Sequence, residues 1–95
     1  MSDREAQVDK MKAQIDRWNA EIEKMQARAR EAEADARLKY EEQMTEMRAQ
    51  RDAAEARMKE VRDASEAAWN DMRKGMESSW DAISRSFSDA MNRFR

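Results

Sequence analysis

Large apolar residues recur at intervals of three and four along the last quarter of the chain. They are Trp69, Met72, Met76, Trp80, Ile83, Phe87, Met91 and Phe94. The intervals make up an eleven-residue repeat, which on an α-helix gathers these side chains in one stripe about 100° wide. We call this set the C-terminal stripe. It predicts that residues 69–95 form an amphipathic contact helix.

A second periodic set lies near the N-terminus and follows a heptad. It comprises Val8, Met11, Ile15, Trp18, Ile22 and Met25, and alanines continue the same spacing beyond them. We call these six residues the N-terminal seam. Branched residues at every other seam position are typical of two-stranded coiled coils, although Met and Trp at the alternate positions leave the number of strands open. Residues 1–38 are therefore predicted to be a heptad coiled-coil segment.

The middle of the chain carries a weaker apolar pattern. Tyr40, Met44 and Met47 continue the apolar side only if extra residues are inserted into the heptad, and polar Arg51 and Ser65 occupy expected seam positions. Such an insertion is a stutter, which locally changes the supercoil. We therefore expect residues 39–68 to be a weakly apolar helical spacer.

Few residues in this chain interrupt a helix, since it contains one Gly and no Pro. The sequence predicts an all-α fold: a long, nearly continuous helix that forms an oligomeric coiled coil or helical bundle. The candidate break is Gly75, followed by Ser78 and Ser79 as possible helix caps. An unbroken helix of this length would extend about 140 Å at 1.5 Å per residue.

Composition and charge narrow the possible functions. Charged residues make up 42% of the chain, yet the net charge is only −2. Because neither residues 1–68 nor residues 69–95 form a basic tract, nucleic acid is not an expected partner. The absence of His and Cys, together with the single Gly, removes the usual catalytic triads and phosphate-binding loops. We therefore expect no enzymatic activity and no cofactor.

The nine methionines raise the possibility of copper binding, because thioethers are ligands for Cu(I). Met44–Met47 and Met72–Met76 have ligand-like spacing, but a helical seam requires the same spacing. Without His or Cys to complete a site, we interpret the methionines as a contact surface and predict no metal site. An N-terminus without an apolar signal region favours a cytoplasmic protein.

Part of the chain resembles a group of small bacterial coiled-coil proteins of unassigned function. The resemblance rests on the segments ASEAAW at residues 64–69 and GMESSW at residues 75–80, on Phe87, and on the preceding alanine-rich coil. More loosely, the eleven-residue repeat is similar to apolipoprotein-type and phasin-type helices, which coat lipid or polyester surfaces. These resemblances imply a helical fold and transfer no functional residues.

Two functions remain open at this stage. The first is a structural or scaffolding protein that self-associates through the N-terminal seam and the C-terminal stripe as a homo-oligomer. The alternative is a peripheral protein whose amphipathic helix coats a lipid membrane or a hydrophobic granule. On the helix of residues 69–95, the polar face opposite the C-terminal stripe is not rich in Lys and Arg. Proteins that bind anionic membranes usually have such a basic face. Another protein is a further possible partner at this stripe.

Overall fold

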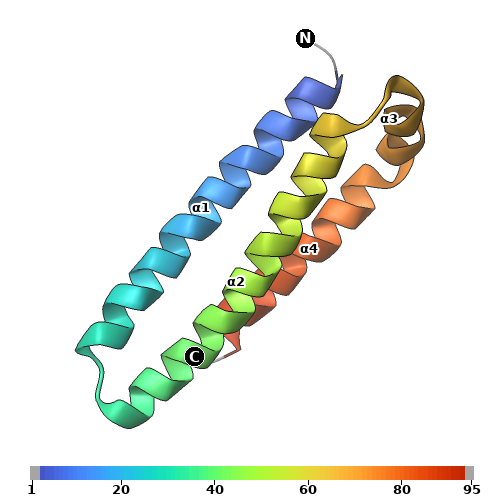
Figure 1. Ribbon diagram of the computed structural model, residues 1–95. Coiled ribbons are helices and arrows are strands. Elements are labelled where there is room, and N and C mark those ends of the chain that lie inside the picture. The colour runs from blue at the N-terminus through green and yellow to red at the C-terminus, as the bar shows by residue number, and fades with distance from the viewer. Residues whose placement is uncertain (1–2, 94–95) are drawn as a thin grey trace.

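The computed structural model describes residues 3–93, and the regular secondary structure of these residues is entirely helical. The elements are α1 (Asp3–Glu31), α2 (Ala34–Asp63), α3 (Glu66–Met72), a 3-10 turn (Arg73–Gly75) and α4 (Met76–Asn92). α1 and α2 form an antiparallel hairpin, and α4 runs back beside α2 (Figure 1). We call α3, the 3-10 turn and α4 the third arm. The prediction of an all-α fold is confirmed.

The prediction of one nearly continuous helix is wrong. The chain reverses at residues 32–33 and again at residues 64–65, so the molecule measures 52 × 19 × 15 Å with a radius of gyration of 15.6 Å. Glu33 and Ser65 both have extended backbones, with φ −67° at each and ψ 163° and 166°. Any residue can adopt this conformation, so the chain turns without Gly or Pro.

The first turn is stabilised by a single arginine. Arg37 Nε donates a hydrogen bond to the carbonyl of Ala29 (3.1 Å), and Arg37 Nη2 donates to the carbonyl of Ala32 (3.1 Å). Carbonyl groups at the end of a helix lack intrahelical partners, and a cation there also interacts favourably with the helix dipole. Arg37 thus takes the place of the glycine that commonly ends a helix.

The second turn is stabilised by an N-cap. Ser65 Oγ accepts a hydrogen bond from the backbone N–H of Ala68 at 3.1 Å. Ser residues favour this position because their side-chain oxygen satisfies an otherwise unpaired amide. Ser65 therefore begins a new helix, whereas the sequence pattern placed it as a polar interruption of a continuing seam. The cap brings Trp69, the first large residue of the third arm, into the core.

Gly75 marks a change of helix geometry within the third arm. The 3-10 turn ends there, with Gly75 at φ −112° and ψ 9°, and α4 begins at the next residue. Trp69 before the turn and Met76 after it are both buried. The C-terminal stripe therefore faces the core on both sides of Gly75, and the chain does not reverse at this position.

α2 is the central helix of the bundle. Its residues Met47, Ala54 and Val61 are fully buried, because α1 covers one side of α2 and α4 covers another. These three residues lie within the segment that was expected to be a weakly apolar spacer. Within residues 3–93, none of the helices is long and apolar enough to cross a membrane.

Replacing Gly75 with Ala should stabilise the fold by about 0.5–1 kcal/mol, because alanine restricts the unfolded chain more than glycine does. A Cβ atom at Gly75 would meet nothing within 4 Å, and its negative φ suits an L-residue. Urea denaturation followed by circular dichroism measures the change. Ala82→Gly, at an exposed position of α4, is the reverse control and should cost about 1 kcal/mol. A clear loss of stability in Gly75→Ala would contradict the backbone conformation described here.

Candidate interaction surface

The N-terminal seam and the C-terminal stripe meet inside one chain. Trp18 of α1 stacks on two aromatic rings of α4. Its ring centroid lies 5.6 Å from that of Trp80 and 4.7 Å from that of Phe87, and the interplanar angle is 16° in both pairs. Stacked pairs of this kind contribute about 0.5–1.5 kcal/mol beyond the burial of their area. Both of these ring contacts join the first helix to the last.

A hydrogen bond accompanies this stack. Trp80 is only 3% exposed, and its indole Nε1 donates to the side-chain Oε1 of Gln14 on α1. A buried indole N–H needs an acceptor, because an unpaired donor keeps the full cost of losing water. Gln14 thus satisfies the one polar atom of Trp80 within an apolar contact.

The remaining apolar residues divide into three clusters along the bundle. The large cluster contains Met11, Ile15, Ala54, Val61, Trp69, Met76 and Trp80, with Val8, Trp18, Met58, Ala64, Met72 and Ile83 packed on it. The middle cluster contains Ile22, Met47, Phe87 and Ala90, with Trp18 and Met91 packed on it. The hairpin cluster contains Met25, Ala29 and Met44, with Tyr40 packed on it.

Every described member of the two predicted contact sets belongs to one of these clusters, and Phe94 lies outside the described residues. In one continuous helix the N-terminal seam and the C-terminal stripe could not cover each other, which is why self-association was expected. The two reversals allow them to do so. In the folded single chain, which we call the closed bundle, these residues lie in the core or pack against it. A second molecule is therefore not needed to shield them from water.

The sequence pattern led us to expect only a weakly apolar face on α2, whereas in the structure this face is buried. Ala54 is too small to stand out in the pattern, and Arg51 occupied a position expected to be apolar. In the structure Arg51 Nη1 donates to Asn19 Oδ1 of α1 at 2.9 Å, and Arg51 Nε lies 3.0 Å from Asp52 Oδ1. A polar bridge between α1 and α2 thus lies beside the core. Met47, Ala54 and Val61 follow one another at intervals of seven residues, and this spacing was the available signal.

The C-terminal end of α4 is fastened to α2 by two polar contacts. The side chain of Gln43 donates from Nε2 to the carbonyl of Met91, and Arg93 forms an ion pair with Glu46. α4 ends at Asn92, close to these contacts. Beyond this point towards the hairpin turn, α1 and α2 continue as a two-helix layer, which contains the hairpin cluster (Figure 1).

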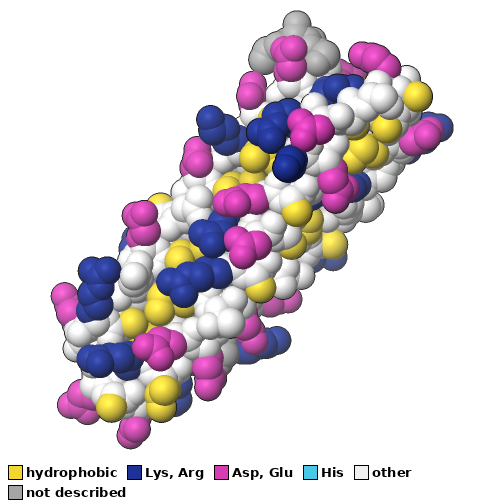
Figure 2. All heavy atoms as spheres, in the orientation of Figure 1, with side chains coloured by type: hydrophobic (Ala, Val, Ile, Leu, Met, Phe, Trp, Pro, Cys, Tyr) yellow, Lys and Arg dark blue, Asp and Glu magenta, His cyan; other side chains and the backbone are white. Residues whose placement is uncertain are grey.

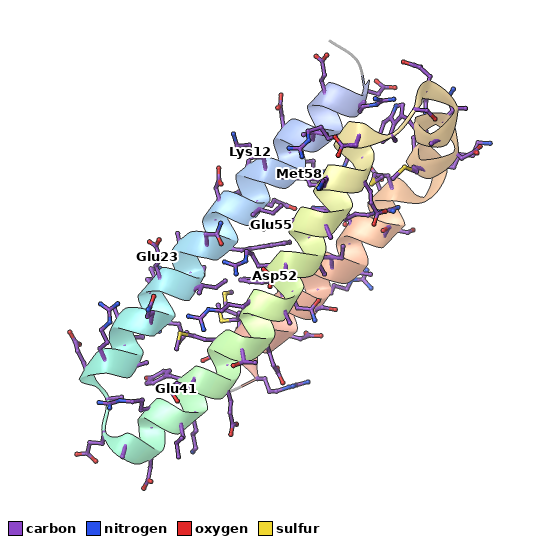
Figure 3. All side chains as sticks on the ribbon, in the orientation of Figure 1. Lys12, Glu23, Glu41, Asp52, Glu55 and Met58 are labelled. Atoms are coloured by element: carbon purple, nitrogen blue, oxygen red, sulfur yellow. The ribbon has the colours of Figure 1, made fainter. Side chains whose placement is uncertain are left out.

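Two hollows lie between α1 and α2. One, of about 590 Å³, is near the hairpin turn and is lined by Gln26, Ala29, Arg30, Arg37, Glu41, Met44, Thr45 and Arg48. The other, of about 490 Å³, lies further along, where Lys12 of α1 faces Asp52, Glu55 and Met58 of α2 (Figure 3). Charges of both signs border the second hollow, whereas arginines predominate in the first.

The methionines within residues 3–93 lie in the core or pack against it. Met44 and Met47 belong to two different clusters, and Met72 and Met76 share the large cluster with apolar neighbours. Within residues 3–93 no group of three or more His, Cys, Asp or Glu side chains is placed to hold a metal ion. The flexible thioether side chain is well suited to filling irregular space between helices.

Comparison with protein-family models, with curated proteins and with solved structures found no match for this chain.

Replacing Trp80 with Ala should lower the free energy of unfolding by about 3–5 kcal/mol, because it removes a buried aromatic side chain and leaves a cavity. Gln14→Ala should cost about 1–3 kcal/mol, since it leaves the indole N–H of Trp80 without its acceptor. Urea denaturation of the monomer measures both effects. The control Ser88→Asp, on the exposed side of α4, should change stability by no more than about 0.5 kcal/mol. Equal effects at Trp80 and Ser88 would contradict an intramolecular core built on Trp80.

Proposed function

We propose that this chain is a non-catalytic structural or scaffolding protein, cytoplasmic and bacterial, that assembles with other copies by exchanging its third arm. In such an assembly the third arm of one copy packs on the α1–α2 hairpin of another. The N-terminal seam and the C-terminal stripe would then form the contact between copies. The observation that supports this proposal is the connection between α2 and α3, which consists of Ala64 and Ser65 in extended conformation, without Gly or Pro.

The exchanged form would reuse the contacts of the closed bundle. The stack of Trp18 on Trp80 and Phe87 would form between two chains instead of within one. Because the contacts are the same, the balance between the two forms depends on the conformation of the turn and on protein concentration. Exchange of an identical element therefore forms an oligomer at a small cost in free energy.

The turn residues are compatible with a helix. If Ala64 and Ser65 became helical, α2 and α3 would join into one helix and the third arm would point away from its own hairpin. The residues around the turn, from Arg62 to Ala68, include no helix breaker and three alanines, which have the highest helix propensity. The cap of Ser65 on Ala68 opposes this change by about 1 kcal/mol.

Two substitutions at this turn should shift assembly in opposite directions. Ser65→Ala removes the cap and should increase the oligomer. Glu66→Pro should reduce it, because proline inside a continuous α2–α3 helix costs about 3 kcal/mol in each chain. The closed bundle accepts this proline, since Glu66 is the first residue of α3 and the preceding Ser65 is extended. Sedimentation equilibrium over a range of concentrations measures the populations.

The matched control is Glu66→Ala, which removes the same carboxylate without restricting the backbone. It should assemble like the original chain. If the original chain stays monomeric at every concentration, or if Ser65→Ala and Glu66→Pro show the same mass distribution, the third arm is not exchanged and this proposal fails.

Coating of a lipid or granule surface is the second candidate, and the amphipathic character of α4 favours it. Met76, Trp80 and Phe87 are buried on one side of α4, while Asp81 and Arg85 are exposed on another. Release of the third arm would offer this apolar side to a hydrophobic surface. Vesicle flotation with phosphatidylcholine separates the two candidates. Surface coating would be favoured over self-assembly by two results together. The original chain would be monomeric without vesicles, and it would bind vesicles in a manner that Glu66→Pro abolishes.

A further inference from the structure

The methionines are the only sulfur-containing residues of this chain, since it has no Cys. Those within residues 3–93 divide into two groups by exposure. One group is almost completely buried, at most 6% exposed, and comprises Met11, Met25, Met44, Met47 and Met76. The other group is half-buried and comprises Met58, Met72 and Met91. Figure 2 shows hydrophobic side chains that reach the surface between the helices. Because oxidation to methionine sulfoxide requires an oxidant to reach the sulfur, the half-buried group is the one open to this reaction.

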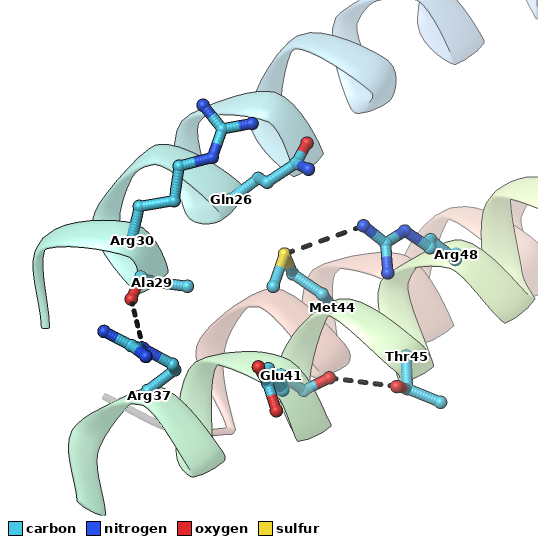
Figure 4. Close-up of a pocket in the computed structure, with 8 residues that line it drawn as sticks. All are labelled: Gln26, Ala29, Arg30, Arg37, Glu41, Met44, Thr45 and Arg48. Carbon is cyan, nitrogen blue, oxygen red and sulfur yellow. Dashed lines mark hydrogen bonds between the residues drawn. The ribbon is translucent and has the colours of Figure 1, made fainter. Parts of the chain in front are cut away.

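Met44 borders the hollow near the hairpin turn, yet it is protected in two ways. Only 5% of its surface is exposed, and Arg48 Nη2 donates a hydrogen bond to its thioether sulfur at 3.9 Å (Figure 4). A sulfur lone pair that accepts a hydrogen bond is less available to attack an oxidant. Closeness to a hollow therefore does not make Met44 reactive, and the exposure of the side chain decides which methionines are accessible.

Met58 is the half-buried methionine of the α1–α2 hairpin. It lines the second hollow together with Lys12, Asp52 and Glu55, and no residue of the third arm lines this hollow (Figure 3). A sulfoxide oxygen on Met58 would face charged side chains and water, which can satisfy it. Oxidation of Met58 is therefore expected to have little effect on how the third arm is held.

The other two half-buried methionines belong to the third arm. Met72 is the last residue of α3 and packs on the large cluster, whereas Met91 lies in the last turn of α4 and packs on the middle cluster. Both clusters contain residues of α1 and α2. The backbone carbonyl of Met91 also accepts a hydrogen bond from Gln43 Nε2 of α2, and Gln43 is only 3% exposed. The accessible sulfur atoms of the third arm thus lie near its two ends, against the core that it shares with the hairpin.

We propose that Met72 and Met91 are oxidation sites through which a peroxide loosens the third arm from the α1–α2 hairpin. The thioether sulfur attacks one oxygen of hydrogen peroxide, so an S–O bond forms while the O–O bond breaks. The proton of the transferred oxygen passes to the leaving hydroxide, which becomes water. Sulfur loses two electrons and the peroxide gains them. Each reaction places a polar sulfoxide where an apolar side chain packed before.

A sulfoxide at either position weakens the contact between the arm and the hairpin. Its oxygen either stays in the apolar contact without a partner, or turns to water and draws the side chain out of the cluster. The closed bundle and the exchanged form use the same contacts, so oxidation loosens the arm in both. This inference therefore does not rest on exchange of the third arm.

Hydrogen peroxide is the probe, applied to the folded full chain, and peptide mass spectrometry locates the sulfoxides. Met58, Met72 and Met91 should be oxidised before the five buried methionines. Hydrogen exchange of the amides of residues 76–92 then reports how firmly α4 is held. These amides should exchange about tenfold faster after oxidation, the size expected for one poorly satisfied polar group in a packed contact. The two methionine sulfoxide reductases with a dithiol should restore the original rate.

Leucine variants test which methionines are responsible. In the double variant Met72→Leu/Met91→Leu, peroxide should leave the exchange of α4 unchanged, because leucine has no sulfur and a similar volume. Met58→Leu is the matched control, since it removes the half-buried methionine of the hairpin, and it should keep the full response. Circular dichroism verifies that the helices are intact. If the double variant has lost helix, the two single variants are compared instead, and each should show a reduced response.

Three results would overturn the proposal. The buried methionines are oxidised as fast as the half-buried ones, or oxidation of Met72 and Met91 leaves the exchange of α4 unchanged, or Met58→Leu protects α4 as well as the arm variants do. None of these readouts depends on oligomeric state, so the outcome is separate from that of the exchange experiment.

Discussion

The contact of Trp18 with Trp80 and Phe87 is the interaction on which the rest of this fold depends. It joins the first helix to the last across about sixty residues of sequence, and it belongs to both the large and the middle cluster. The chain must reverse twice to form it. The first reversal brings the apolar side of α1 onto α2, the second brings α4 onto another side of α2, and α2 becomes the central helix.

The two reversals contain no Gly or Pro. This feature underlies both the fold and the proposed exchange of the third arm. Arg37 holds the end of α1, and Ser65 caps the start of α3, while the turn backbones are extended. Neither turn relies on a residue that forbids a helix. The same amino acids therefore suit a closed bundle and a form in which α2 continues into α3, and the stability of one relative to the other depends on a few polar contacts.

The sequence was sufficient to predict the helices and most of the core. The described residues of the N-terminal seam and the C-terminal stripe are buried or partly buried, and the helix geometry changes at Gly75. Periodicity shows that a side is apolar but not whether its partner is the same chain or another, so the reversals were missed. The central place of α2 was missed because Ala54 is fully buried by its position between two helices and not by its size. The hollow near the hairpin turn was missed because its lining comes from both α1 and α2.

Small-angle X-ray scattering in dilute solution tests the central claim that one chain covers its own apolar surfaces. The closed bundle predicts a monomer with a radius of gyration near 15.6 Å. A continuous helix of about 140 Å would instead give about 40 Å. A dilute monomer near the larger value would contradict the account, because Trp18 would then be too far from Trp80 to contact it within one chain.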